Sequence, residues 1–285
     1  MSKSRSISRL IQPQMVIEGA GVRLLRSFGP SRSNLFDPFL LFDHFAFNDP
    51  AEGDGPGFPT HPHRGIETVT YMLEGVVSHR DSLGNQGLVG PGDVQWMTSG
   101  RGILHEEMPR RGPSGNIFGF QLWVNLPAAV KMSPPRYQEI KAAQLPLQHL
   151  DGASLRLVAG EVGGLRGPVT EIAINPVYME VQLEPGASFA YPVNPGATVL
   201  AYVFAGEALF GDAPAQPVSS IAMLVLEDGE VVQVQAGEAG ARFMLAAGTP
   251  IREPIAPYGP FVMNTTEEIQ QALADLRNGT FVTSA

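Results

Sequence analysis

Cysteine is absent from the 285 residues of this chain. Without thiols the fold cannot rely on disulfides, and any metal ion must be bound through nitrogen and oxygen ligands. Charged residues make up only 16% of the chain, and the net charge of −9 at pH 7 disfavours direct binding of nucleic acid. The basic N-terminus is not followed by an apolar run long enough for a signal peptide or a membrane span. We therefore expect a cytoplasmic protein that has no membrane partner.

Glycine and proline, by contrast, are abundant, with 32 and 25 residues. Alternating apolar and polar residues recur in short stretches, for example at 67–73 and 198–204. This pattern is typical of short antiparallel strands joined by tight turns. Near the C-terminus, Thr265 and Glu268 can form a capping box and Gly279 can end a helix. The predicted fold class is all-β with one short C-terminal helix.

A weak internal repeat indicates that the fold is duplicated. A shift of 131 positions lays residues 61–75 on residues 192–206. The shift aligns three pairs of identical residues: Gly65 with Gly196, Tyr71 with Tyr202, and Gly75 with Gly206. A duplicated barrel accounts for this correspondence.

The boundary between the two barrels is predicted at about residue 140. Within residues 127–150 the alternation is lost and prolines accumulate, as expected of a connecting segment. The prediction is an N-terminal barrel of residues 1–140 and a C-terminal barrel of residues 141–285 that includes the terminal helix.

Two pairs of potential metal ligands share the spacing i, i+2. His61 and His63 form one pair, and His105 and Glu107 form the other. Residues two apart in a strand point to the same face, so two such pairs on neighbouring strands can surround one ion. Four ligands on one side of an octahedral ion leave about two positions for water, dioxygen or a chelating substrate. Imidazole with carboxylate suits Fe(II), and also Mn, Ni, Cu or Zn.

These residues can instead be ordinary polar residues at a turn and at a strand end. Glu67 has the face parity of His61 and His63 if the strand is regular. It is therefore a candidate further ligand, a hydrogen-bond acceptor for a ligand imidazole, or a structural residue. Gln121, Trp123 and Asn125 either line the mouth of a pocket or belong to a strand with one buried aromatic residue.

The remaining histidines are interpreted as packing or surface residues. His44, His79 and His149 lack a partner at ligand spacing. Because no histidine follows His149, the C-terminal barrel is predicted to be free of metal.

Three segments of the chain resemble the pirin family of two-domain cupin proteins. They are HPHRGIETVTYMLEG (61–75), PGDVQWMTSGRGILHEEMP (91–109) and EPIAPYGPFVMNTTEEI (253–269). The resemblance implies two tandem cupin barrels of the jelly-roll type, the second a degenerate copy. It also implies one metal ion, usually iron, in the N-terminal barrel. The implied ligands are His61, His63, His105 and Glu107, so the carboxylate comes from Glu107 and not from Glu67.

The resemblance implies two alternative functions. Members of the family are described as flavonol (quercetin) dioxygenases and as iron-dependent regulatory proteins that bind transcription factors or metabolic enzymes. The first implies a mononuclear enzyme, with Fe(II) favoured, that opens a small aromatic flavonol such as quercetin with O2 and releases carbon monoxide. In that enzyme Glu107 would be the general base. The second implies a redox-sensitive protein with a protein partner. The enzyme is favoured because open coordination positions beside an apolar cavity suit a small aromatic substrate.

Overall fold

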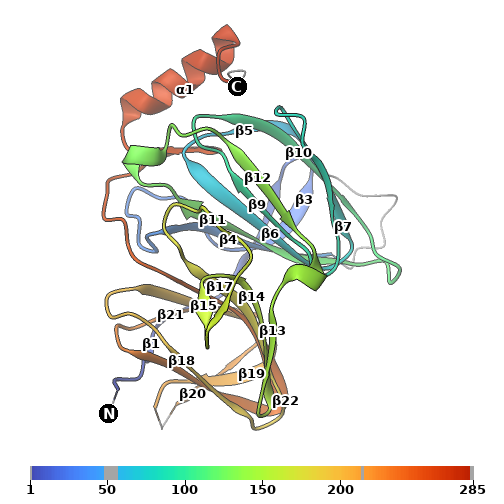
Figure 1. Cartoon of the computed structure of the whole chain (residues 1–285), viewed down its shortest axis with the longest axis vertical. Coiled ribbons are helices and arrows are strands. Elements are labelled where there is room, and N and C mark those ends of the chain that lie inside the picture. Colours follow the sequence, from blue (N-terminus) through green and yellow to red (C-terminus); the bar gives the residue numbers. More distant parts are fainter. Residues whose placement is uncertain (1, 48–56, 213–214, 283–285) are drawn as a thin grey trace. The chain divides into compact units, whose positions relative to one another are not determined.

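The computed structural model describes residues 2–47, 57–212 and 215–282, and these residues are organised mainly as antiparallel strands (Figure 1). The chain divides into two compact units. The first unit comprises residues 14–142 and 251–285, and the second unit comprises residues 1–13 and 143–250.

Two sheets make up most of the described part of the first unit. The larger sheet has the strand order β12-β9-β6-β11-β4-β3-β2, and the smaller has the order β5-β10-β7-β8. The strands of the larger sheet are β2 (Gln14–Glu18), β3 (Val22–Phe28), β4 (Phe39–Phe47), β6 (Ile66–Glu74), β9 (Val94–Thr98), β11 (Ile117–Asn125) and β12 (Arg136–Ile140). Those of the smaller sheet are β5 (Phe58–His63), β7 (Val76–Asp81), β8 (Gln86–Val89) and β10 (Ile103–Arg110). The first unit also holds the hairpin β23 (Ala256–Tyr258) and β24 (Phe261–Met263), and the helix α1 (Thr266–Asn278).

One sheet dominates the second unit, with the strand order β1-β21-β19-β22-β17-β14-β13. These strands are β1 (Ile7–Ile11), β13 (Leu147–Leu150), β14 (Ala153–Ala159), β17 (Val177–Leu183), β19 (Thr198–Phe210), β21 (Ala222–Leu226) and β22 (Val231–Gly248). Off this path, β18 (Ser188–Pro192) pairs with β22 and β20 (Gln216–Ser219) pairs with β19. The short strands β15 (Glu161–Val162) and β16 (Leu165–Arg166) also belong to this unit. The 3-10 helix η1 (Ala128–Val130) belongs to the first unit, and η2 (Ala142–Gln144) lies where the chain passes from the first unit to the second.

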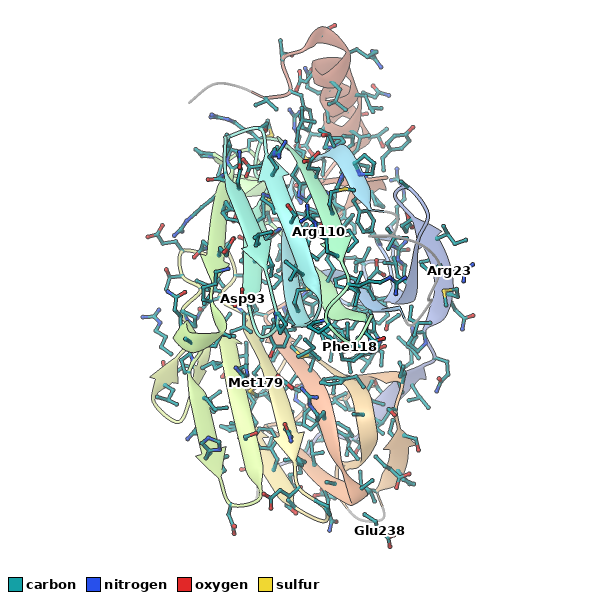
Figure 2. The ribbon with its side chains drawn as sticks, turned by 90° about the vertical axis from the view of Figure 1, so that its right-hand side faces the viewer. Arg23, Asp93, Arg110, Phe118, Met179 and Glu238 are labelled. Carbon is teal, nitrogen blue, oxygen red and sulfur yellow. The ribbon has the colours of Figure 1, made fainter. Side chains whose placement is uncertain are left out.

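Alternating burial along the strands builds the core of the second unit. In β18, Phe189 and Tyr191 are buried while Ser188 and Ala190 are exposed. Met179 on β17 belongs to this core, whereas Glu238 on β22 is exposed (Figure 2). Because side chains alternate between the two faces of a strand, a period of two is enough to bury one face and leave the other in water. The all-β prediction with two cupin units and one terminal helix is confirmed.

The capping residues of α1 are those predicted. The Thr265 hydroxyl accepts from the backbone N–H of Glu268 at 3.2 Å, and the Glu268 carboxylate accepts from the N–H of Thr265 at 2.9 Å. Gly279 ends the helix with a φ of 71°. These contacts satisfy donors and acceptors that the ends of a helix leave unpaired.

The internal repeat corresponds to matching local geometry in the two units. Gly75 and Gly206 have φ values of 77° and 69°, in the left-handed region that favours glycine. Tyr71 and Tyr202 are both fully buried. The identical residues therefore keep the same structural positions in both copies.

The two ends of the chain do not follow the expected division at residue 140. Strand β1 pairs with β21 in the second unit, although the N-terminal residues were assigned to the first barrel. Helix α1 was assigned to the C-terminal barrel, but it belongs to the first unit, where Ile269 packs with Phe261 and Phe281. An ion pair at 2.7 Å between the buried Arg64 and the partly exposed Asp275 also attaches the helix to this unit. Both corrections arise from pairing between segments that are far apart in the sequence.

Candidate metal centre

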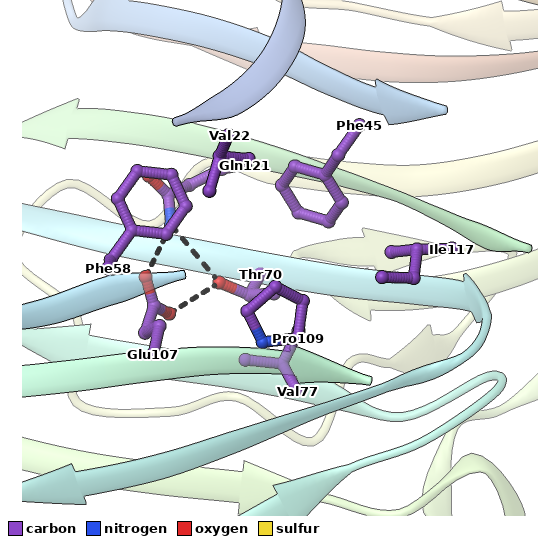
Figure 3. A pocket seen from close by; sticks show the side chains of 9 residues that line it. All are labelled: Val22, Phe45, Phe58, Thr70, Val77, Glu107, Pro109, Ile117 and Gln121. Atoms are coloured by element: carbon purple, nitrogen blue, oxygen red, sulfur yellow. Dashed lines mark hydrogen bonds between the residues drawn. The ribbon is translucent and has the colours of Figure 1, made fainter. Parts of the chain in front are cut away.

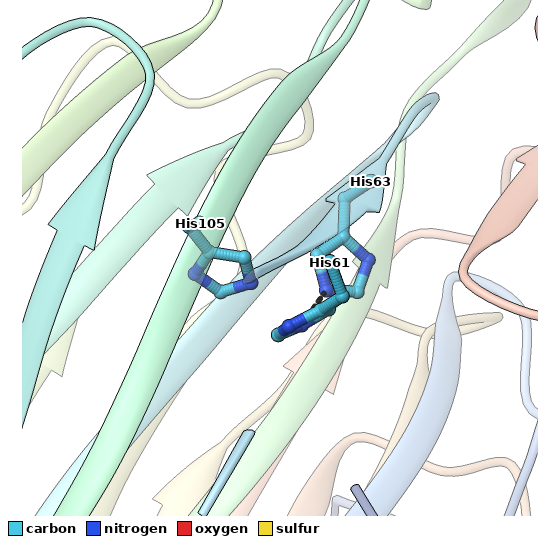
Figure 4. Close-up of side chains that lie close together, drawn as sticks. All are labelled: His61, His63 and His105. Atoms are coloured by element: carbon cyan, nitrogen blue, oxygen red, sulfur yellow. Dashed lines mark hydrogen bonds between the residues drawn. The ribbon is translucent and has the colours of Figure 1, made fainter. Parts of the chain in front are cut away.

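Neighbouring antiparallel strands carry the two predicted ligand pairs. His61 and His63 lie on β5, and His105 and Glu107 lie on β10. His105 is directly opposite His61 in the register, and Ile103 is opposite His63. Residues opposite each other in a sheet point to the same side. The imidazoles of the three histidines accordingly converge (Figure 4).

His61 and His63 each use one ring nitrogen for the backbone. Nδ1 of His61 donates to the carbonyl of Pro59 at 2.9 Å, and Nδ1 of His63 donates to that of Pro260 at 3.1 Å. With the proton on Nδ1, each Nε2 carries a lone pair, and the two Nε2 atoms lie only 3.1 Å apart. Two lone pairs at this distance repel unless a cation or a proton lies between them. The arrangement therefore suits a metal ion, whose histidine ligands commonly donate their second N–H to such an acceptor.

His105 completes the histidine cluster. Its ring is 1% exposed, and neither nitrogen has a hydrogen-bond partner among the described residues. Possible ligand atoms of His61, His63 and His105 lie within 4.8 Å of one another. Burial lowers the pKa of His63 to about 3 and that of His105 well below its usual range, with further lowering from neighbouring histidines. Both rings are therefore neutral at pH 7, which is the form that binds a metal.

The carboxylate of Glu107 is oriented by side chains from the larger sheet. Gln121 on β11 donates to Oε2 at 3.0 Å, while Thr70 on β6 and Gln95 on β9 donate to Oε1 at 3.3 Å each. The indole N–H of Trp123 donates to the amide oxygen of Gln121 at 3.1 Å, which turns the amide nitrogen toward Glu107. Residues of the larger sheet thus fix the position of a carboxylate that the smaller sheet carries.

His79, predicted to be a packing or surface residue, is buried beside the candidate centre, with its ring stacked on that of Tyr137 at a centroid distance of 4.6 Å. It lies on β7 opposite Glu107 in the register of β10, and it can form a second ligand group with His105 and Glu107. Its Nε2 lies 3.3 Å from Asp81, and its Nδ1 is buried without a partner among the described residues. The i, i+2 spacing of His79 and Asp81 is a signal that could have identified it.

Glu67 lies away from the ligand cluster. The parity argument required a regular strand, but Gly65, with a φ of 82°, separates β5 from β6, and the two strands belong to different sheets. The Glu67 carboxylate accepts from the Thr98 hydroxyl at 2.8 Å, and burial raises its pKa to about 7. This geometry supports the structural interpretation of Glu67.

The other two histidines are not part of the centre. His44 is fully buried and packs edge-on against Phe118, with ring centroids 4.7 Å apart. His149 is exposed on β13. Both candidate ligand groups lie in the first unit.

A pocket of about 370 Å³ opens beside the ligand cluster. His61, His63 and Glu107 line it, together with Gln121 and Trp123, two of the three residues predicted for a pocket mouth. The third, Asn125, does not line it; it is fully buried, and its side-chain oxygen accepts from Lys131. Much of the remaining wall is apolar and includes Leu24, Leu41, Phe45 and Phe58. A pocket of this size and composition is typical of a site for a small organic molecule.

The guanidinium of Arg26 also lines this pocket, and neighbouring carboxylates bind it. Asp43 accepts from Nε and Nη2 at 2.8 Å each, and Glu18 accepts from Nη1 at 2.6 Å. The positive charge is compensated within the wall, which favours a neutral ligand over a free anion.

Comparison with known proteins gives consistent matches along the chain. A family model described as Pirin matches residues 21–124, and one described as Pirin C-terminal cupin domain matches residues 178–282. The Pirin-like protein of Caulobacter vibrioides is 42% identical, over 97% of this chain and 99% of its own length. Pirin of Homo sapiens is 41% identical, over 98% of this chain and 94% of its own length.

The structure is similar to that of quercetin 2,3-dioxygenase from Acinetobacter baumannii. The TM-score is 0.88 at 35% sequence identity, and the match covers 98% of this chain and 99% of the other. Within the described part of the chain, no helix is both long and apolar enough to cross a membrane.

Proposed function

This chain belongs to the pirin family, and we propose that it is a mononuclear metal enzyme that opens a flavonol such as quercetin with dioxygen. The observation that carries the proposal is the cluster of the His61, His63 and His105 imidazoles, with the Glu107 carboxylate grouped with His105, beside a pocket of about 370 Å³ with largely apolar walls. Its likeness to the Acinetobacter quercetin 2,3-dioxygenase supports the same reaction class. The products would be the ring-opened ester and carbon monoxide.

His61, His63, His105 and Glu107 would hold the ion, which we propose to be Fe(II). The unpartnered nitrogens of His105 and the close approach of the His61 and His63 Nε2 atoms fit a divalent cation bound among them. When bound, such an ion supplies a Lewis acid that lowers the pKa of a chelating substrate hydroxyl. Mn, Ni, Cu and Zn fit the same donors, so the metal must be identified by experiment.

The protein residues have separable roles in this reaction. Glu107 would accept the proton of the substrate 3-hydroxyl, with Gln121 holding its carboxylate in place. The faces of Phe45 and Phe58 would contact the flat ring system and exclude water. Compensation of the Arg26 charge by Asp43 agrees with a neutral polyphenol as substrate.

Metal reconstitution tests the activity. The metal-free protein is loaded anaerobically with Fe, Mn, Ni, Cu or Zn in turn, and quercetin consumption, oxygen uptake and carbon monoxide release are then measured. We expect at least one metal to give turnover above the free-metal control, with equal amounts of quercetin and oxygen consumed. Absence of turnover with every metal would refute the flavonol proposal.

Metal analysis tests the ligand assignment independently of activity. His61→Ala and Glu107→Ala should lose most of the bound metal, because each removes one of four ligands. His149→Ala is the matched control and should keep it, since His149 is exposed and belongs to the other unit. His79→Ala separates the two candidate groups: metal loss in this variant with retention in His61→Ala would move the site toward His79, His105 and Glu107.

The alternative of a redox-sensitive regulator stays a prediction, as does the cytoplasmic location. Pull-down of partner proteins with the Fe(II) and Fe(III) forms tests the regulator alternative. A partner captured by only one form, with no oxygen uptake in the assay above, would favour the regulator. The same partners in both forms would count against a redox switch.

A further inference from the structure

A second, much smaller cavity lies inside the first unit next to Glu107 (Figure 3). Its volume is about 20 Å³, and six apolar residues form most of its wall: Val22, Phe45, Phe58, Val77, Pro109 and Ile117. A cavity needs about 10–15 Å³ to hold one molecule of the size of water, whereas a cavity that binds benzene is nearer 150 Å³. The space therefore admits one very small molecule and excludes an aromatic ring.

The wall of this cavity disfavours water as its occupant. Its polar groups come from Thr70, Glu107 and Gln121, which gather at one side and hydrogen-bond to one another (Figure 3). A buried water normally makes two to four hydrogen bonds, but the apolar residues provide no partners on the other sides. An apolar molecule gives up no hydrogen bonds when it enters such a space, because it makes none in water.

The small cavity adjoins the larger pocket. Phe45, Phe58, Glu107 and Gln121 line both, so the two spaces share a wall. That wall contains the carboxylate of a proposed metal ligand. A molecule in the small cavity would therefore be held at the edge of the metal centre without occupying the substrate pocket.

We propose that the small cavity is a docking site for dioxygen, a diatomic and apolar molecule. This inference rests on the proposed dioxygenase function and adds to it a separate location for the second substrate. Dioxygen and the flavonol would then not compete for the same space, and the gas would be concentrated beside Glu107. Val22 and Val77 line the small cavity but not the larger pocket, which allows the two sites to be altered separately.

Val77→Ile and Val22→Ile test the proposal, because each adds one methylene group to the wall of a cavity of about 20 Å³. The first measurement is binding of xenon, an apolar gas, by crystals under xenon pressure. We expect xenon in the cavity of the wild type, its loss in both isoleucine variants, and higher occupancy in Val77→Ala. This readout requires neither metal nor turnover. An empty cavity in pressurised wild-type crystals would overturn the proposal.

The second measurement is the dependence of turnover on oxygen concentration. Val77→Ile and Val22→Ile should raise the KM for dioxygen several-fold, while the KM for quercetin and kcat at saturating oxygen stay unchanged. Val218→Ile, at a buried position of the second unit, is the control for enlarging a core residue. Two isoleucine variants are used because one of them can fail to fold.

The outcomes separate this proposal from the proposed function. Xenon binding with an unchanged KM for dioxygen in both variants would refute the docking site and leave the dioxygenase intact. A wild type without turnover on any metal would refute the dioxygenase, and the assignment of dioxygen to the cavity would be refuted with it. A raised KM for quercetin in the isoleucine variants would show that the substrate occupies the cavity and would also overturn the proposal.

Discussion

Lys131 allows a quantitative test of what holds the turn at Gly65, which follows the proposed ligands His61 and His63. Its side chain is 1% exposed, and its ammonium group donates to the carbonyls of Gly65 and Val262 and to the side-chain oxygen of Asn125 at 2.7–2.8 Å. Gly65 follows the ligand pair on β5 by two residues, and Val262 lies on β24. One buried amine therefore joins the turn after the histidines to the C-terminal hairpin.

Burial lowers the pKa of Lys131 from 10.5 to about 7. Between these two values the unfolded chain binds a proton that the folded protein does not, so the free energy of unfolding rises with pH. Integrated from pH 7 to pH 9, this linkage amounts to about 2 kcal/mol. Lys131→Met removes the titrating group while keeping a side chain of similar length, so its unfolding free energy should lack this rise.

Urea unfolding of the metal-free protein at pH 7, 8 and 9, followed by tryptophan fluorescence, measures the difference. Both tryptophans, Trp96 and Trp123, lie in the first unit, so the signal reports on the unit that contains Lys131. Lys141→Met is the control, because Lys141 is half-exposed and its pKa is raised, so that it stays charged throughout this range. Equal pH dependence in wild type and Lys131→Met would show that the buried amine does not titrate as argued.

Three further predictions concern residues around the centre. Glu67→Gln should keep its metal, measured by elemental analysis. Burial raises the pKa of Glu67 from 4.5 to about 7, so between these values the folded protein binds a proton that the unfolded chain does not. The free energy of unfolding of the wild type should therefore fall by about 2 kcal/mol from pH 5 to pH 7. The variant should not show this fall. Gln121→Ala removes the donor to Glu107 at 3.0 Å and should weaken metal affinity about tenfold in a metal titration. An unchanged affinity would show that Gln121 does not orient Glu107 for metal binding. Arg64→Met breaks the ion pair with Asp275 and should weaken the docking of α1 by roughly 2 to 3 kcal/mol. The expected result is faster hydrogen exchange at residues 266–278, and unchanged exchange there would contradict this prediction.

The local parts of this structure could be predicted from the sequence. The period-two pattern located strands, and the capping residues located α1, because both depend on neighbouring residues. The i, i+2 pairs placed His61 beside His63 and His105 beside Glu107 on common faces. The pairing of β5 with β10 could not be predicted in this way, because the pattern of one strand does not specify its partner.

Contacts between distant segments could not be predicted in this way. His79 lies beside the centre because β7 pairs with β10, which places it opposite Glu107. Glu67, one of whose predicted roles was structural, is kept away from the ligand cluster because the turn at Gly65 moves the chain from one sheet to the other. The exchanged ends, β1 in the second unit and α1 in the first, also depend on pairing partners more than a hundred residues away.

The chain returns to the first unit after residue 250, and this segment affects the proposed metal centre directly. The Pro260 carbonyl accepts from Nδ1 of His63, so a residue near the C-terminus sets which nitrogen of a proposed ligand is free. The same segment is held by Lys131 through Val262, and Arg64, adjacent to His63, is paired with α1. The N-terminal barrel therefore supplies the four proposed ligands, but the last thirty-five residues hold one of them in its metal-binding tautomer. A fragment ending at the barrel boundary would contain every proposed ligand and still lack part of the site.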